Sequence, residues 1–291
     1  MAPIVVGFVG SAGTVGKSTL PYLLEQDKAG KIKLVILHRE GSDLSKIPQE
    51  VEKRVVQLDE NGSEQNKAAV EGLEVLLSTI GGAGIKSQIY LVDALEGSKT
   101  LKSFIHSDFG TNWTAKELEA PGLSIIKVKE EVVKRAEEKK VPLTHIRTGA
   151  FDVYFFNYNL AGTDIKKNVV QVFRDSLKYG IPITSLSFLG YATTQLILKP
   201  AELPNQILQV YDFDPTGQEI IDVLTKLNGK APEITHYTEE EYQKELLTPG
   251  TGAIVAAIKA KWGSNNFGPS EKPKIDGWKG QSFEELTKSY L

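Results

Sequence analysis

A glycine-rich turn near the amino terminus is the part of this sequence best suited to binding a ligand. Gly10, Gly13 and Gly16 lie between an apolar run over 4–9 and a helical pattern over 16–26. Glycine permits a tight strand-to-helix turn and a close backbone approach to a pyrophosphate, which the helix N-terminus attracts. The turn therefore predicts a dinucleotide site, with a purely structural turn or another phosphate ligand as the alternative. The predicted contacts are Gly10, Ala12, Gly13, Thr14, Val15 and Gly16.

The same stretch partly matches a second phosphate-binding motif. SAGTVGKS ends like the nucleotide loop G-x-x-x-x-G-K-[ST]. However, Ser11 stands where that loop needs its first glycine, and Gly81-Gly82 rather than an acidic magnesium ligand follows the apolar run over 75–80. ATP or GTP hydrolysis is therefore the weaker interpretation.

The end of the second apolar run indicates which dinucleotide would bind. An acidic residue about 20 positions after the glycines binds the ribose 2′-hydroxyl of NAD. Here the run ends at His38-Arg39, and Glu40 comes one position later. Because arginine pairs well with a 2′-phosphate, the sequence favours NADPH, with an ordinary solvated arginine as the alternative. Further cofactor contacts are expected at His38, Thr79, Gly81 and Gly82, although the last three also fit a flexible surface loop.

One lysine breaks the pattern of an amphipathic helix expected over 124–139. Ile125, Val132 and Ala136 form an apolar stripe, and the other charged side chains lie opposite it. Lys129 falls inside the stripe, where burial is costly for an ammonium and lowers its pKa. We expect Lys129 to contact the cofactor ribose or to act as a general acid or base in hydride transfer. The alternative is a lysine that snorkels to the edge of the helix.

Short apolar runs alternate with helical patterns through the first 150 residues, which predicts parallel strands joined by right-handed crossovers. The expected fold is α/β, a doubly wound parallel Rossmann sheet with a smaller C-terminal substrate lobe. We place the NAD(P)-binding domain over 1–150 and the substrate lobe over 151–291. The boundary is soft, because parts of the second half could rejoin the sheet. The predicted strands are 4–9, 34–37, 54–58, 75–80, 101–105 and 143–146.

Composition excludes several classes of protein. With 41% hydrophobic and 24% charged residues over 291 positions, the chain is typical of a globular protein. The absence of cysteine excludes disulfides and thiolate chemistry, and the four histidines have no paired metal-ligand spacing, so no metal is predicted. A net charge of −3 does not favour nucleic acid, and no apolar run is long enough for a membrane helix. We expect a cytoplasmic protein that takes a small-molecule substrate.

Several motifs together resemble the isoflavone-reductase-like and NmrA-like atypical short-chain dehydrogenases. They are the glycine turn, Arg39, the run His106-Ser107-Asp108-Phe109-Gly110, and Val128-Lys129 followed by 141–146. The similarity covers nearly the whole chain, and Lys129 matches the catalytic lysine of the family. The resemblance implies an NADPH-dependent reductase of phenylpropanoid-like or related aromatic metabolites, with the substrate between two lobes.

The sequence departs from the family pattern in several places. The family motif P-S-E-F-G is H-S-D-F-G here, and the motif S-N-x-F is Thr148-Gly149-Ala150-Phe151. The tyrosine that precedes the lysine by four residues in usual short-chain dehydrogenases is Ile125. Because some relatives sense the cofactor without catalysis, a non-catalytic NAD(P) sensor that acts through a protein partner is the alternative function.

The remaining predictions concern the substrate. His106 lies at a strand end and is a candidate proton donor, or else a packing or capping residue. The aromatic run over 151–158 could wall a pocket or simply belong to the core. Within it, Phe151 is expected to contact the cofactor, and Asp152 and Tyr154 are candidates for contact with the substrate.

Overall fold

The computed structural model describes residues 2–268 and 272–291, which form two compact units. The first unit comprises residues up to Phe109, Val128–Ile146 and Leu189–Leu208. The second comprises Gly110–Lys127, Arg147–Phe188 and Gln209–Leu291. Each unit is therefore built from separated segments of the chain. The assignment of cofactor binding to 1–150 and substrate binding to 151–291 stays a prediction.

The first unit contains a seven-stranded sheet in the order β11-β6-β5-β4-β1-β2-β3. Pairing is parallel from β3 through β6, which confirms the predicted doubly wound α/β fold. β11 comes from the second half of the sequence and rejoins the sheet at its edge. The strands are β1 (Ile4–Val9), β2 (Ile32–His38), β3 (Glu52–Val55), β4 (Val75–Ser78), β5 (Ser103–Ile105), β6 (Leu143–Arg147) and β11 (Ile207–Gln209).

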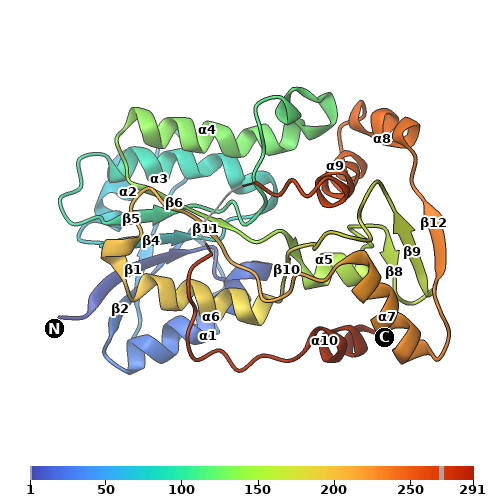
Figure 1. Ribbon diagram of the computed structural model, residues 1–291. Coiled ribbons are helices and arrows are strands. Elements are labelled where there is room, and N and C mark those ends of the chain that lie inside the picture. The colour runs from blue at the N-terminus through green and yellow to red at the C-terminus, as the bar shows by residue number, and fades with distance from the viewer. Residues whose placement is uncertain (1, 269–271) are drawn as a thin grey trace. The chain divides into compact units, whose positions relative to one another are not determined.

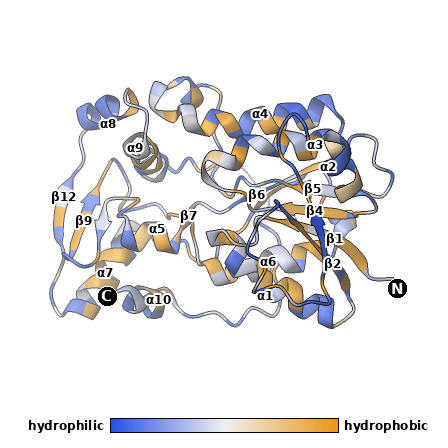
Figure 2. Cartoon of the chain, turned by 180° about the vertical axis from the view of Figure 1, so that it is seen from behind, coloured by the Kyte–Doolittle hydropathy of each residue, from blue (hydrophilic) through white to orange (hydrophobic). Residues whose placement is uncertain are grey.

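Helices cover both faces of this sheet (Figure 1). On one face lie α2 (Ser63–Val70), α3 (Gln88–Leu95) and α4 (Ser124–Glu138), and on the other lie α1 (Thr14–Lys28) and α6 (Leu186–Ile197). Strands covered on both faces must be apolar on both, which is why they form continuous hydrophobic runs. Figure 2 shows this hydrophobic character along β1, β2 and β4. The core includes Val35, Leu76 and Phe104, each fully buried.

Strand order fixes where a ligand can bind in the first unit. The order reverses between β1 and β4, because the chain moves outward from β1 first to β2 and β3 and then to β4 and β5 on the other side. In open parallel sheets this switch point leaves a crevice at the carboxyl ends of the strands. The segments that follow β1, β2, β4 and β5 therefore form the candidate site.

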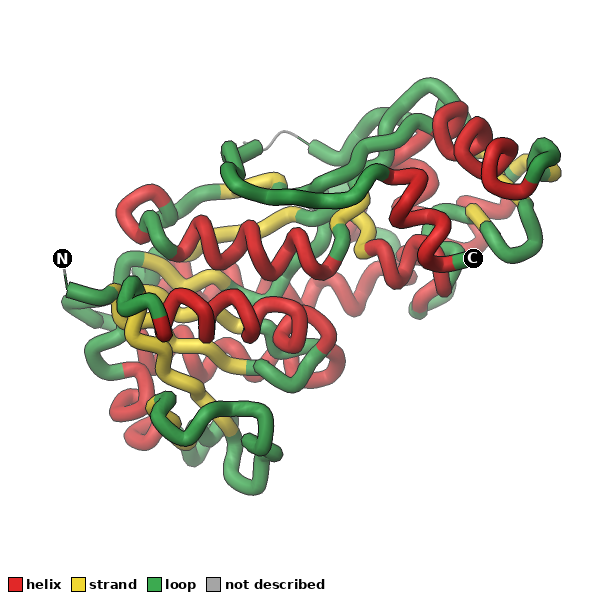
Figure 3. The backbone as a smooth tube through the Cα atoms, turned by 90° about the horizontal axis from the view of Figure 1, so that it is seen from below, coloured by secondary structure: helices red, strands yellow, loops and turns green. Residues whose placement is uncertain are grey.

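The second unit has two small sheets as well as helices, and Figure 3 shows its strands in yellow and its helices in red. Its core contains Phe155, Phe156, Leu224 and Trp262. Capping boxes begin three of its helices, at Thr216, Thr238 and Ser282, and satisfy backbone N–H groups of the first turn. One sheet has the order β12-β9-β8, with β8 (Thr163–Asp164), β9 (Val169–Val172) and β12 (Glu233–His236), and the other pairs β7 (Ala150–Phe151) with β10 (Ile183–Thr184). The helices are α5 (Asp152–Asn157), α7 (Gly217–Asn228), α8 (Glu239–Leu246), α9 (Thr251–Gly263) and α10 (Phe283–Tyr290).

Short 3₁₀ helices complete the secondary structure of the described chain. They are η1 (Gly82–Ser87), η2 (Glu117–Glu119), η3 (Pro121–Leu123) and η4 (Pro200–Glu202). Over the described ranges, every helix is too short or too polar to cross a membrane.

Candidate functional site

The glycine turn after β1 has a backbone that only glycine can adopt. Gly10 has a φ of +89°, and a Cβ there would lie 2.7 Å from the carbonyl carbon of Thr79. A Cβ on Gly16 would lie 2.1 Å from the carbonyl oxygen of Gly10. Both contacts are too short for a side chain, so the first and third glycines are required by the packing of the turn against β4 and of α1 against the turn.

The turn is also held by hydrogen bonds and leaves the start of α1 accessible. Thr79 Oγ1 donates to the carbonyl oxygens of Val9 at 3.1 Å and of Gly10 at 2.9 Å. Gly13 is the N-cap of α1, and Ala12, Gly13 and Thr14 are exposed. The N–H groups at this helix terminus can therefore be reached by an anion such as a pyrophosphate, and the geometry fits a dinucleotide.

The other predicted cofactor residues of the first unit follow neighbouring strands. His38 ends β2 and Arg39 follows it, with an exposed guanidinium side chain. Gly81 and Gly82 follow β4 and are exposed, and Gly82 has a φ of +57°. Since β1, β2 and β4 are parallel neighbours, the structure brings these residues to one edge of the sheet. Their contacts with a cofactor stay predictions.

The Lys129 side chain on α4 is largely, though not fully, removed from solvent, which agrees with its place in the apolar stripe. Val132 and Ala136 are buried beside it, whereas the side chain of Ile125 lies outside the described part of the chain. The Lys129 side chain is 15% exposed and its Nζ donates to Asp108, to the backbone oxygen at 2.6 Å and to Oδ1 at 3.1 Å. Burial lowers the pKa of Lys129 to about 8. The ammonium is thus held by an acidic partner just beyond β5.

Two histidines lie beside this ion pair because β5 and β6 are in register. Ile105 pairs with Thr144, which places the following residues, His106 and His145, next to each other. His106 Nε2 lies 3.1 Å from His145 Nδ1, and His145 Nδ1 lies 4.0 Å from Asp108 Oδ2. Burial lowers the pKa of His145 and favours its neutral form. Asp108 and His145 are not among the predicted site residues, and the signal that identifies them is the strand register.

The predicted substrate residues of the second unit have varied surroundings. Tyr154 is 42% exposed, and its ring stacks on Phe151 with centroids 5.8 Å apart. Asp152 is buried, its Oδ1 accepts a hydrogen bond from the Val153 N–H at 2.8 Å, and burial raises the pKa of its carboxyl group. Phe151 and Tyr154 thus offer an aromatic surface, whereas Asp152 has a partner within its own unit. Their roles toward cofactor and substrate stay predictions.

Gly149, which replaces an asparagine of the family pattern, is required by the local backbone. Its φ is +69°, and a Cβ there would lie 2.4 Å from the carbonyl oxygen of Pro182. Glycine at this position therefore permits a tight contact between the segments that form β7 and β10.

Curated relatives with similar sequences are plant reductases. The chain is 24% identical over 194 residues to phenylcoumaran benzylic ether reductase IRL1 of Ginkgo biloba, covering 65% of this chain and 63% of that protein. It is 26% identical over 263 residues to a bifunctional pinoresinol-lariciresinol reductase of Sinopodophyllum hexandrum, covering 83% and 81%. The chain thus spans less than two thirds of the length of the Ginkgo relative.

Solved structures with the same fold include reductases of this group. An isoflavone reductase superposes with a TM-score of 0.78 at 18% identity, covering 99% of this chain and 100% of that one. A leucoanthocyanidin reductase from Vitis vinifera in complex with NADPH superposes with a TM-score of 0.74 at 19% identity, covering 98% and 99%. At these identities the likeness establishes the fold. Residues 4–291 match the NmrA-like family, so the chain belongs to that family, among relatives named as isoflavone reductases and related reductases.

Proposed function

We propose that this protein is an NADPH-dependent reductase of a small aromatic substrate, with Lys129 as proton donor or relay. The observation that carries the proposal is the position of Lys129, which is buried and hydrogen-bonded to Asp108 just beyond β5. In the sequence, Lys129 stands at the position of the catalytic lysine in the family pattern. Membership of the NmrA-like family and relatives that reduce phenylpropanoid-type compounds support the same conclusion.

The cofactor would be held at the carboxyl ends of β1, β2 and β4. The turn from Gly10 to Gly16 and the N-terminus of α1 suit its pyrophosphate, and Arg39 suits a 2′-phosphate. Thr79, which fixes the turn, belongs to the same edge. NADPH supplies a hydride when bound. Phe151 is proposed to contact the cofactor as well.

The reducing step needs a proton as well as a hydride. A carbonyl, a benzylic ether or a conjugated alkene takes up hydride at one atom and a proton at another. Lys129 holds a proton in a site from which most water is excluded, and Asp108 orients its ammonium through two hydrogen bonds. We infer that Lys129 supplies this proton directly or through a water molecule.

The proposal is tested by substrate-dependent oxidation of NADPH. Purified protein is incubated with NADPH and a set of benzylic ethers, isoflavones and flavan precursors, and the product is identified by mass spectrometry. We expect turnover of at least one member with NADPH, together with transfer of deuterium from labelled cofactor to product. Tight NADPH binding without turnover of any substrate, and with cofactor-dependent capture of a protein partner, would instead support the sensor, which the replacement of the usual tyrosine by Ile125 motivates.

Arg39 is proposed to select NADPH over NADH. Its exposed guanidinium follows β2 at the edge described above. In Arg39→Ala we expect NADPH to bind roughly tenfold more weakly, since a charge-assisted pair is worth about 1.5–3 kcal/mol before solvent screening, and NADH affinity to change little. Calorimetric titration of both cofactors measures this, with Lys46→Ala as an exposed control. Equal losses for the two cofactors would contradict the assignment.

A further inference from the structure

We propose that His106, His145 and Asp108 form a binding site for a divalent transition-metal ion of the zinc class. Their ligand atoms all lie within 4.8 Å of one another. The inference does not depend on reductase activity, because metal binding can be measured directly.

The distances suit such an ion. His106 Nε2 and His145 Nδ1 are 3.1 Å apart, and His145 Nδ1 and Asp108 Oδ2 are 4.0 Å apart. Ligand atoms about 2.0–2.1 Å from a tetrahedral zinc ion are about 3.3 Å from each other. Movements of well under 1 Å would bring these two edges to that spacing, and the third edge, between His106 and Asp108, is no longer than 4.8 Å. Closing all three edges would produce three zinc ligands with a fourth position left open.

The ligand types select the class of metal. Two imidazoles and one carboxylate favour zinc and neighbouring transition metals over Mg²⁺ and Ca²⁺, which prefer oxygen ligands. Lys129 opposes the binding of any divalent cation, because its ammonium donates to the other oxygen of Asp108. The two imidazole nitrogens would have to hold the ion against that repulsion. Both nitrogens can bind the ion once the proton that the two rings share has moved to the other nitrogen of one ring.

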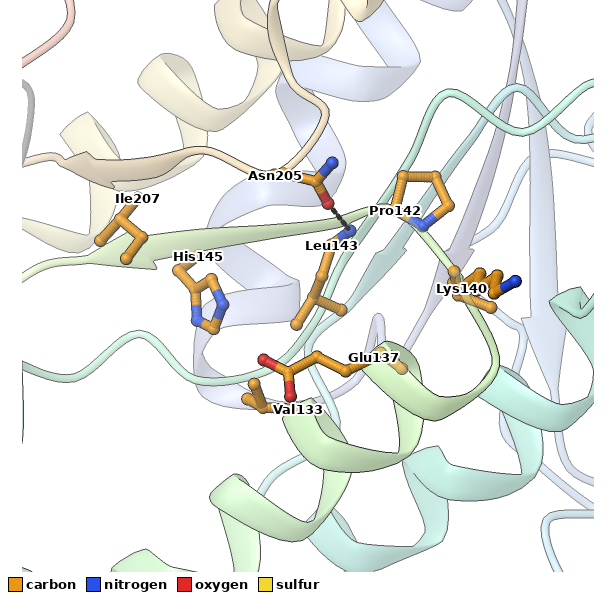
Figure 4. Close-up of a pocket in the computed structure, with 10 residues that line it drawn as sticks. Val133, Glu137, Lys140, Pro142, Leu143, His145, Asn205 and Ile207 are labelled. Carbon is orange, nitrogen blue, oxygen red and sulfur yellow. Dashed lines mark hydrogen bonds between the residues drawn. The ribbon is translucent and has the colours of Figure 1, made fainter. Parts of the chain in front are cut away.

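Neighbouring groups hold the three side chains in place, and a pocket adjoins one of them. The Asp108 carboxylate is fixed by Lys129, and strand pairing fixes the two histidines. His145 also lines a pocket of about 500 Å³ together with Glu137. Figure 4 shows the imidazole of His145, from β6, and the carboxylate of Glu137, from α4, directed into this pocket. Of the three proposed ligands His145 lines this pocket, and Glu137 and Lys140 place one acidic and one basic side chain on its wall.

The site could not be recognised from spacing, and it departs from the expectation that the chain has no metal site. His106 and His145 are far apart in the sequence and meet only through the parallel register. His106 and Asp108 are also two positions at which this chain differs from the family motif P-S-E-F-G. Both differences change an apolar or longer side chain into one that suits a compact metal site.

The test uses full-length, tag-free protein treated with chelator and titrated with Zn²⁺, with Mg²⁺ as a comparison. We expect one Zn²⁺ per chain by calorimetry and elemental analysis, a higher thermal midpoint with Zn²⁺, and a visible absorption band with Co²⁺. No response to Mg²⁺ is expected. Failure of the wild-type protein to bind Zn²⁺ at tens of micromolar would overturn the site.

Variants separate this site from surface binding. His145→Gln and Asp108→Asn should each weaken Zn²⁺ binding by about 100-fold or more, and His236→Gln, which changes an exposed histidine on β12, should leave it unchanged. Circular dichroism and the thermal midpoint without metal show that each variant folds. Unchanged Zn²⁺ affinity in a folded His145→Gln variant, or its loss in His236→Gln, would overturn the proposal.

Discussion

Lys129 in the first unit and Lys261 in the second are both buried lysines, but their partners differ. Lys261 Nζ donates to Glu117 Oε1 at 2.6 Å and lies 4.7 Å from the centre of the Trp113 ring. The ion pair connects α9 with η2. Lys129 meets Asp108 at the carboxyl end of a strand in the parallel sheet. Burial lowers the pKa of both. Burial alone therefore does not identify a functional lysine, and the proposal for Lys129 rests on the position of its partner in the fold.

A second lysine on α9 supports this distinction. Lys259 lies 4.0 Å from the centre of the Tyr237 ring and donates to Gln171 Oε1. Its partners come from the sheet of the second unit and from the segment before α8. Both buried lysines of α9 thus connect elements of their own unit, which is a structural task. Substitution of the two kinds of lysine should therefore affect different properties.

The largest effect is expected for Lys129→Met, which keeps the length of the side chain and removes the proton. We expect kcat/KM to fall by about 10³-fold, since a general acid typically contributes between about 10² and 10⁴. NADPH affinity should change little, whereas the thermal midpoint should fall, because Asp108, whose side chain is 3% exposed, loses its ion-pair partner. Steady-state kinetics and cofactor titration measure the three quantities. Retained kcat/KM in a folded Lys129→Met variant would make Lys129 the same kind of residue as Lys261.

Lys261→Met should lose stability without a loss of activity. Removal of one partner of a buried ion pair costs about 3–5 kcal/mol, and the partial exposure of Glu117 places this pair near the lower value. We expect a loss of about 3 kcal/mol in the free energy of unfolding, with kcat/KM retained below the unfolding transition. The double variant Lys261→Met/Glu117→Gln should recover part of the stability, because it leaves no unpaired charge. An activity loss without a stability loss would contradict the distinction.

Lys129 and α9 also differ in how far the sequence predicts them. Lys129 stands out because it interrupts a regular stripe on a helix with one polar face, and the exposed Lys127, Glu130 and Glu131 obey that pattern. α9 was not predicted. Residues from Ala256 to Gly263 are all buried, so the helix has no polar face from which a period could be recognised. Its two buried lysines then look like ordinary surface residues.

The metal cluster shows the same limit at the sheet. The glycine turn is local, so its residues and the strand before it suffice to predict the geometry of Gly10 and Gly16. His106, Asp108 and His145 depend on the pairing of β5 with β6, which no local pattern contains. The return of β11 to the sheet is likewise a long-range event. Spacing within one segment was therefore informative about the turn and uninformative about the histidines.

The smallest effect concerns Asp152, a buried acid of the second unit. Burial raises the pKa of its carboxyl group in the folded protein, and Tyr290, Val153 and Asp212 are its polar neighbours. Because the pKa of Asp152 is higher in the folded than in the unfolded protein, folding favours the protonated carboxyl group. The stability linked to this protonation is complete below the unfolded pKa near 3.8 and is lost as pH rises through the folded pKa. Asp152→Asn should therefore gain stability relative to the wild type between about pH 4 and pH 7.

Chemical denaturation across this pH range measures that difference, and Asp175→Asn serves as the control because Asp175 is an exposed acid paired with Lys178. The control variant should show no comparable gain, since its substitution removes a surface ion pair and relieves no buried charge. If Asp152 is a structural acid of its own unit, the pH-dependent gain should appear without cofactor or substrate. A gain that appears only when a ligand is bound would instead favour a role for Asp152 in ligand binding rather than in the fold.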